Sequence, residues 1–259
     1  MPSGAEGFSA LTPPAILRRM QTTQHNWTII DGDAGVLSFS YMFAREGQAN
    51  CFTARLASGG LLVISPPSRI SEAEMADLAA FGEVEALVAN NGYHHLGIGP
   101  WREKFPRARC FAASGAAARI GKRSKNAGEL EPLSALQPLL AEGVAVIEAP
   151  ASKAGETWAF AKIAGGYAWY ASDILANMEQ LPSNFIVRSL FKLSKSAPGY
   201  KVFSLALMII LKDKKRALGT MLEDVRKHPP TVMVPAHGGI LSHASLAAET
   251  EQLLLGAIG

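Results

Sequence analysis

Short runs of β-branched and aromatic residues, separated by turn residues, fill the first third of the chain. This pattern is typical of β-strands. Ser58, Gly59 and Gly60 stand between the last two runs and predict a hairpin turn there. The predicted strands cover residues 27–31, 36–44, 51–57 and 60–65.

Helical and strand patterns alternate after these runs. Ser71 with Glu74 three residues later forms a capping-box signature, which predicts a helix over 71–81. A hairpin over 157–173 is predicted to turn at Gly165 and Gly166. The other predicted strands are 86–90, 108–113, 144–150 and 231–239, and the other predicted helices are 212–228 and 242–258.

Each half of the chain therefore begins with hairpins and continues with strand–helix alternation. This order favours an α+β fold in which two mixed sheets pack together with helices outside them, a four-layer αβ/βα sandwich. The sequence has no short repeat and no low-complexity linker, so we expect one domain over 1–259. Residues 114–135 are expected to form a surface excursion.

Charge and cysteine content narrow the possible partners and the compartment. The net charge of +3 is small for 259 residues, and no broad basic stripe argues for nucleic acid. Cys51 and Cys110 are far apart and typical of reduced cysteines in a cytoplasmic protein. The start of the chain does not resemble a signal peptide. The most apolar run, 202–211, is about half the length of a membrane span and is expected to be a buried helix segment.

Metal-competent side chains follow three predicted strands. His94 and His95 come after 86–90, Asp173 ends the 157–173 hairpin, and His237 lies in 231–239. Strand ends can direct such side chains into a common cleft, and imidazoles with a carboxylate suit Zn, Fe or Mn. Two structural alternatives remain: solvent-facing histidines, and Asp173 as the N-cap of a helix over 174–180.

The stretch "ANNGYHHLGIG" resembles the first motif of the metallo-β-lactamase superfamily, H-x-H-x-D-H after a strand. The resemblance places His95 at the last histidine and His94 at the aspartate. Asn90 and Gly92 then stand where the family has its first two histidines.

The remaining family motifs follow in order, and the resemblance covers about residues 27–258. "EAPASKAGE" fits the P-G-H-T-x-G stretch with Ser152 in place of the histidine. "YASDILA" fits the bridging aspartate with Asp173, and "VPAHGG" fits the last histidine with His237. Ser65 stands where the family usually has an aspartate.

The resemblance implies that one half of a dinuclear centre is lost. One metal site of the family uses the places of Asn90, Gly92 and Ser152, which are poor ligands for transition metals. The other site keeps metal-competent residues. The resemblance therefore implies one divalent transition metal, Zn foremost and Fe or Mn as alternatives, with the candidate ligands His94, His95, Asp173 and His237.

Two functions follow from this pattern. The first is a mononuclear metal-dependent hydrolase of a small-molecule ester, lactone or phosphodiester, in which Asp173 could also act as general base. In it, Tyr93 or Ser152 could contact the substrate, although a plain loop serine is the simpler interpretation of Ser152. The second is a binding or scaffold protein that kept the fold without catalysis. The fold does not choose the substrate.

Residues 182–211 mix apolar and basic side chains. We expect a helical insertion that covers the cleft and not a membrane span, because lysines interrupt the apolar run. The same composition also fits a dimer contact or a segment at a membrane surface. The sequence leaves the oligomeric state open.

Overall fold

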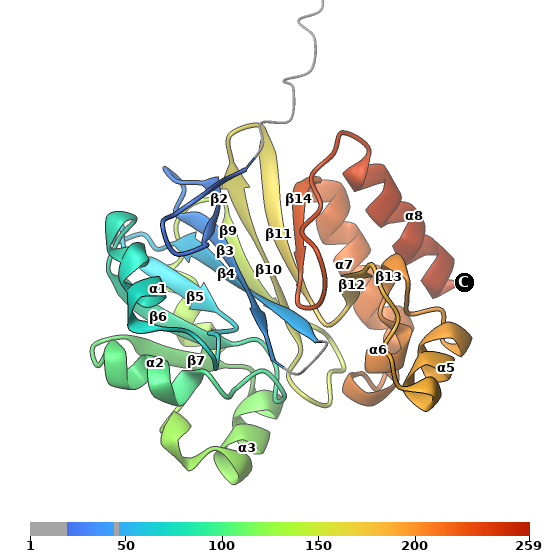
Figure 1. Cartoon of the computed structure of the whole chain (residues 1–259), viewed down its shortest axis with the longest axis horizontal. Coiled ribbons are helices and arrows are strands. Elements are labelled where there is room, and N and C mark those ends of the chain that lie inside the picture. The colour runs from blue at the N-terminus through green and yellow to red at the C-terminus, as the bar shows by residue number, and fades with distance from the viewer. Residues whose placement is uncertain (1–19, 44–46) are drawn as a thin grey trace, which may run out of the picture.

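Two large β-sheets dominate the computed structural model, which describes residues 20–43 and 47–259 (Figure 1). The first sheet has eight strands in the order β1-β2-β3-β4-β5-β6-β7-β8. It is antiparallel up to β5 and parallel from β5 onwards. Its strands are β1 (Gln21–Thr22), β2 (Thr28–Asp31), β3 (Val36–Met42), β4 (Gln48–Arg55), β5 (Leu61–Ile64), β6 (Val84–Ala89), β7 (Arg109–Ala112) and β8 (Glu131–Pro132).

The second sheet has four strands in the order β14-β11-β10-β9. β10 and β11 form the predicted hairpin, and β14 joins β11 in parallel. A separate two-stranded sheet pairs β12 with β13. These strands are β9 (Val144–Glu148), β10 (Thr157–Ile163), β11 (Gly166–Ser172), β12 (Leu175–Met178), β13 (Gly199–Val202) and β14 (Pro230–Pro235).

Helices cover the outer faces of both large sheets, and an apolar core fills the space between them. Trp101 and Ile120 belong to the core between the first sheet and its helices, and Trp169 and Met221 to the core between the second sheet and its helices. The predicted four-layer αβ/βα sandwich is confirmed. The core between the sheets includes Val36, Phe52, Leu62, Val88, Tyr170 and Val234.

Three of the α-helices in the described part of the chain begin at a side-chain cap, which is Ser71, Asn184 or Asp213. The capping box of Ser71 and Glu74 is formed, and the predicted helix there is divided into an α-helix and a 3-10 turn. The α-helices are α1 (Glu72–Ala76), α2 (Ile98–Lys104), α3 (Ser114–Arg123), α4 (Leu133–Leu136), α5 (Phe185–Leu193), α6 (Ser204–Ile210), α7 (Lys214–Lys227) and α8 (Leu246–Ile258). The 3-10 helices are η1 (Asp77–Ala80), η2 (Lys125–Ala127) and η3 (Gln137–Leu139).

Two local predictions are wrong. Residues 114–123 do not form a loose excursion, because α3 buries Ala116 and Ile120 in the core over the first sheet. Asp173 does not cap a helix, because the residues after it form strand β12, whose partner β13 lies far along the chain. Neither the packing of α3 nor the pairing of β12 with β13 leaves a signal in the local sequence.

The segment 182–211 forms α5, β13 and α6. The run 202–211 is only partly buried, since α6 buries Leu207 and Ile210 but exposes Met208 and Ile209. None of the helices in the described part of the chain has the length and hydrophobicity that a membrane crossing needs.

Candidate metal site

His94, Asp173 and His237 converge at the ends of three strands. One ligand atom from each side chain lies within 4.8 Å of the other two. His94 follows β6, while Asp173 and His237 follow the parallel neighbours β11 and β14, which pair up to Ser172 and Pro235. Parallel strands bring their carboxyl ends to one edge of a sheet, so this pairing places Asp173 beside His237.

The spacing of these atoms fits one small metal ion. Asp173 Oδ1 lies 3.4 Å from His94 Nε2 and 3.2 Å from His237 Nε2. Ligands of a tetrahedral zinc ion, at bonds of about 2.0 Å, are separated by about 3.3 Å. Asp173 Oδ1 is buried and makes no hydrogen bond among the described residues. A buried carboxylate oxygen without a hydrogen bond is the group that a bound cation would satisfy.

The second nitrogen of each imidazole is anchored. His237 Nδ1 lies 3.0 Å from the carbonyl oxygen of Gln48. A carbonyl only accepts, so Nδ1 carries the hydrogen and the neutral ring presents the lone pair of Nε2 toward Asp173. His94 Nδ1 lies 3.1 Å from the hydroxyl of Ser65. Such contacts orient histidine ligands in metal sites.

A buried amide and a second carboxylate stand behind Asp173. Asn91 Nδ2 donates to Asp173 Oδ2 at 2.9 Å and to Glu156 Oε2 at 2.8 Å. The backbone N–H of Asp173 donates to Glu156 Oε1. Asn91 Oδ1 accepts from the backbone N–H groups of Tyr93 and His94. Every polar atom of the Asn91 side chain is thus used to fix the loop against the two acids.

The two carboxylates differ in their pKa values. Burial, and then the negative charge of Asp173, raise the pKa of Glu156 to about 8. Burial opposes ionisation of Asp173 as well, but electrostatic attraction to the imidazoles of His94 and His237 outweighs it and holds the pKa of Asp173 well below its usual range. Burial lowers the pKa of His237, and contact with Asp173 reverses this into a raised pKa. Glu156 therefore holds a proton at neutral pH while Asp173 is charged.

His95, the fourth ligand that the sequence suggests, is not brought into this group. It is buried, and its Nδ1 lies 2.7 Å from the hydroxyl of Ser124 beyond α3. Burial, and then the positive charge of Arg119, lower the pKa of His95. The described residues thus bring together three of the four candidate ligands: His94, Asp173 and His237.

Asn90 and Ser152, at two of the three places where the resemblance expects a histidine, make structural contacts. The amide of Asn90 donates to Ser172 Oγ at 2.5 Å. Ser152 Oγ accepts from the backbone N–H of Glu156 and donates to the carbonyl oxygen of Ile210 in α6. These contacts support the simpler interpretation of Ser152 as a loop serine.

Arg119 of α3 packs against Gly92, the third place where the resemblance expects a histidine. A Cβ atom at Gly92 would lie 2.5 Å from Arg119 Cδ. Arg119 Nε donates to the carbonyl oxygen of Gly92, and its guanidinium carbon lies 3.9 Å from the centroid of the exposed Tyr93 ring. That distance is typical of a cation–π contact.

Unusual backbone and aromatic rings border the group. Ser65 and Ser172 have φ angles of 55° and 53°, in the left-handed region that non-glycine residues seldom adopt. Such strain often marks functional sites. The rings of Phe43 and Phe203 lie 5.1 and 6.0 Å from the His237 ring and give the site apolar neighbours.

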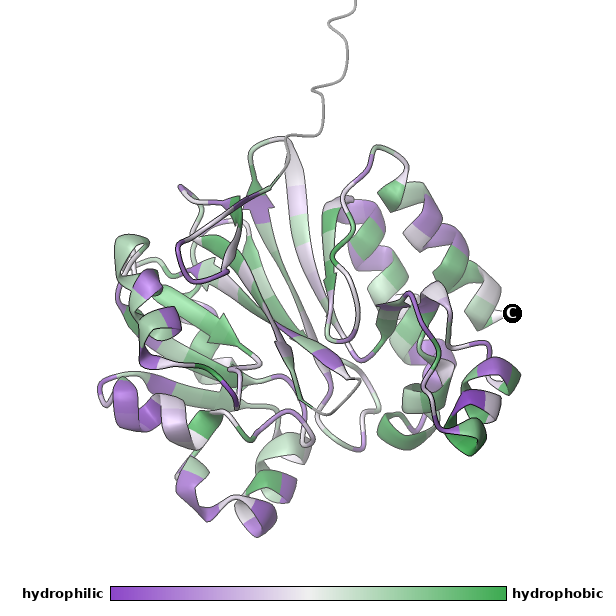
Figure 2. Ribbon diagram, viewed as in Figure 1, coloured by the Kyte–Doolittle hydropathy of each residue, from purple (hydrophilic) through white to green (hydrophobic). Residues whose placement is uncertain are grey.

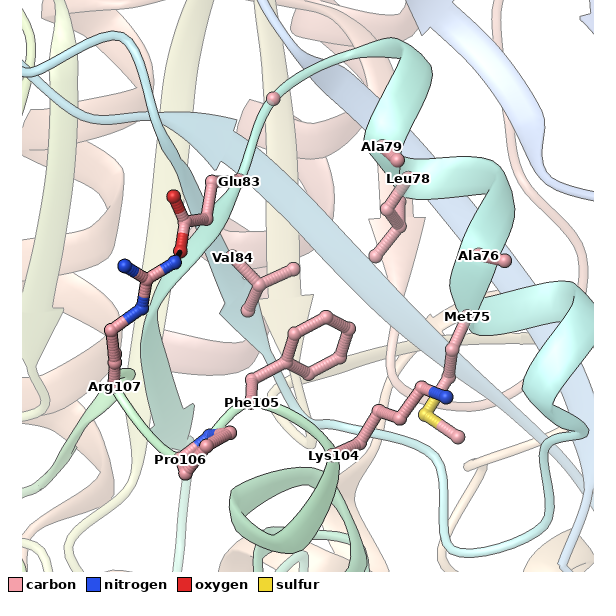
Figure 3. Close-up of a pocket in the computed structure, with 11 residues that line it drawn as sticks. Met75, Ala76, Leu78, Ala79, Glu83, Val84, Lys104, Phe105, Pro106 and Arg107 are labelled. Atoms are coloured by element: carbon pink, nitrogen blue, oxygen red, sulfur yellow. Dashed lines mark hydrogen bonds and ion pairs between the residues drawn. The ribbon is translucent and has the colours of Figure 1, made fainter.

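A surface pocket of about 490 Å³ lies elsewhere, between α1, η1 and the loop after α2 (Figure 3). Val84, at the start of β6, lines it, whereas His94 follows the end of that strand. Of its three charged residues, Glu83 and Arg107 pair with each other, and Lys104 pairs with Glu72. This pocket is separate from the metal-competent group.

No protein-family model matches the chain, and no curated protein matches its sequence. Solved structures do match its fold. The Flv1 flavodiiron core from Synechocystis sp. PCC6803 has a TM-score of 0.57 and 10% identity over 91% of this chain; the match spans 62% of that protein's length. The DIM-1 metallo-β-lactamase has a TM-score of 0.56 and 10% identity over 92% of this chain and 99% of its own.

A third match is the FIM-1 metallo-β-lactamase from Pseudomonas aeruginosa, solved in a mono-zinc form. Its TM-score is 0.54 at 12% identity, over 92% of this chain and 97% of its own. Identities this low establish the fold and no more. The chain is a divergent protein with the metallo-β-lactamase fold.

Proposed function

We propose that the chain binds one divalent transition metal ion through His94, Asp173 and His237 and hydrolyses a small-molecule ester, lactone or phosphodiester. The observation that carries this proposal is the buried Asp173 Oδ1, which faces two imidazole Nε2 atoms without a hydrogen bond. Zinc suits the two imidazoles and one carboxylate, and iron or manganese are the alternatives. Three protein ligands leave room for substrate in a four-coordinate site.

The chain's own residues would orient and polarise this site. A metal ion bound here supplies Lewis acidity toward a carbonyl or phosphoryl oxygen. Asn91 holds Asp173 in place, and Gln48 fixes the tautomer of His237. The role of Asp173 as general base stays a prediction. Its Oδ2 accepts a hydrogen bond from Asn91, and its Oδ1 faces the two imidazoles. Phe43 and Phe203 favour substrates with an apolar portion beside the scissile bond.

Metal analysis combined with a substrate screen tests this proposal. Purified protein is dialysed against Zn²⁺, Mn²⁺ or Fe²⁺ and assayed with p-nitrophenyl esters, lactones and bis-p-nitrophenyl phosphate. We expect one ion per chain and turnover of one of these classes, both lost in His237→Ala. His243→Ala, a histidine outside the group, serves as matched control and should behave like the wild type. Turnover that survives His237→Ala would refute the proposal.

A non-catalytic binding or scaffold role is the second candidate. It is favoured by Asn90, Ser152 and Arg119, which turn the replaced half of the centre into structural contacts. Protein that binds none of the three metals at micromolar concentration, yet melts cooperatively, would establish this second candidate over the hydrolase.

A further inference from the structure

The helix α5 exposes large apolar side chains to solvent. None of its nine residues is buried, and Phe185, Ile186 and Leu193 are exposed by 78%, 69% and 84%. A surface helix normally turns such residues toward the core. Neighbouring α6 adds Met208 and Ile209, exposed by 72% and 56%. Figure 2 shows hydrophobic residues on both helices at one edge of the molecule, away from the two large sheets.

The segment 182–216, which contains both helices, carries a concentrated positive charge. Residues 182–216 contain eight lysines and arginines against one aspartate, a net charge of +7. The whole chain has +3, so the remainder carries −4. All eight basic residues are exposed, and none forms an ion pair with a carboxylate in the described part of the chain. They are Arg188, Lys192, Lys195, Lys201, Lys212, Lys214, Lys215 and Arg216.

The segment is firmly joined to the body of the protein, so its exposed face is presented outward. The hydrogen bond from Lys153 N–H to the Ile210 carbonyl joins α6 to the loop after β9. Within the segment, the Phe191 and Phe203 rings lie 5.6 Å apart. Ser196 Oγ accepts from the backbone N–H of Leu205, which ties the end of α5 to α6.

We propose that α5 and α6 dock the protein onto the surface of an anionic lipid bilayer. Phe185, Ile186 and Leu193, with Met208 and Ile209, would enter the boundary between headgroups and acyl chains. The surrounding lysines and arginines would contact the acidic headgroups. Exposed apolar side chains with basic ones nearby in the sequence are the features of interfacial helices, and neither feature alone anchors a protein stably.

Charge complementarity selects this occupant over a second copy of the chain. Two copies meeting face to face would bring two segments of +7 together, with no acidic groups on the segment to offset them beyond Asp213. A bilayer with acidic lipids supplies both an apolar phase and negative charge.

Vesicle co-sedimentation with the full chain tests the docking surface. Vesicles of phosphatidylcholine alone are compared with vesicles containing about 30% phosphatidylglycerol at low and high salt. We expect binding to the acidic vesicles only, weakened at least tenfold by 0.5 M NaCl, since counterions screen headgroup charge.

Two variants separate the apolar and the charged contributions. The triple variant F185S/I186S/L193S and the triple variant K192E/K195E/K201E should each lose at least tenfold in vesicle binding. Matched controls change exposed residues of the same types elsewhere: L96S/L255S and K122E/K125E should bind as the wild type does. The substituted side chains are exposed, so unchanged thermal melting is expected to verify folding.

A probe at the surface gives an independent reading. Both native cysteines are buried, so F185C can be labelled with an environment-sensitive dye at one position. A blue shift on adding acidic vesicles is expected. Absence of binding to acidic vesicles, equal binding of the wild type and both triple variants, or a dimer that F185S/I186S/L193S abolishes in protein without vesicle binding would overturn the proposal. The last result would instead make this face a contact between copies.

Discussion

Arg119 and Gly92 pack so closely that a single methyl group at position 92 would lie 2.5 Å from Arg119 Cδ. The resemblance to metallo-β-lactamases places a metal-binding histidine at this position. The structure thus has no space for that ligand while Arg119 lies where it does. Packing around Arg119, as well as the change of residue type, therefore excludes that ligand from position 92.

Gly92→Ala should destabilise the protein by about 1–3 kcal/mol, the usual cost of overpacking. In the Arg119→Ala variant, Gly92→Ala should lower the free energy of unfolding much less than it does in the wild type, because the Arg119 side chain it clashes with is gone. Urea unfolding of the four proteins in the cycle measures the coupling. Gly121→Ala in α3 is the control: nothing lies within 4 Å of its added Cβ, and we expect a small gain in stability. Additive effects at 92 and 119 would contradict the packing argument.

Metal content should distinguish the neighbouring histidines. His94→Ala and His237→Ala each remove an Nε2 atom facing Asp173 and should weaken zinc binding more than about 100-fold, beyond the loss typical of outer-sphere changes. His95→Ala should retain one ion, because the His95 ring contacts Ser124 instead. Competition titration with a chromogenic chelator provides the measurement. Equal losses in the 94 and 95 variants would restore His95 as a ligand.

Asn91→Asp should be strongly destabilising although it hardly changes the size of the side chain. The amide nitrogen that donates to Asp173 and Glu156 would become a carboxylate oxygen, which accepts only, beside the two existing carboxyl groups. An uncompensated buried charge of this kind costs about 3–5 kcal/mol. Chemical unfolding in the presence of EDTA measures it. Asn184→Asp at the N-cap of α5 makes the same change where a carboxylate caps equally well, and should be close to neutral.

Stability of the metal-free protein should fall as pH rises, through Glu156. Its carboxyl ionises near 4.5 in the unfolded chain, whereas burial and Asp173 raise its pKa to about 8 in the folded state. The unfolded state therefore binds fewer protons between these values, so the contribution is complete below pH 4.5 and lost toward pH 8.

Glu156→Gln isolates that contribution. The free energy of unfolding, measured from pH 5 to 8 in EDTA, should decline less with pH in Glu156→Gln than in the wild type. His237, whose pKa is also raised, adds a loss of the same sign in both proteins. The lowered pKa of Asp173 acts only below 3.8 and stays outside this range. Parallel pH profiles of the two proteins would contradict a protonated Glu156.

Much of the fold was predictable because its strands and turns are encoded locally. The hairpin turns at Gly59 and Gly165, and the strands that precede Asp173 and His237, all follow from short-range patterns. The strand–helix order then determined the layers. The sequence does not predict α3, because its small alanine and glycine residues pack closely against the first sheet without an apolar stripe of large side chains.

The site was predictable at the level of strand ends but not of individual side chains. His94 and His95 are adjacent in a loop, where no period of two indicates which ring faces the cleft. Glu156 and Asn91 resemble any polar loop residues, and only long-range packing buries them together. The exposure of α5 could not be predicted either, because its apolar pattern is that of a buried helix and the structure leaves these side chains uncovered.

Asn50 of β4 gives the loop of His237 a second role, in folding. Its amide donates to the carbonyl oxygens of Pro235 and Gly238, and its backbone N–H to that of Ala236. The loop that carries the candidate ligand His237 therefore also joins the two sheets by hydrogen bonds. His94 comes from one half of the chain, and Asp173 and His237 from the other, so the group exists only after the halves have docked. Metal capture during refolding would accordingly report the late joining of the two sheets rather than the formation of either one.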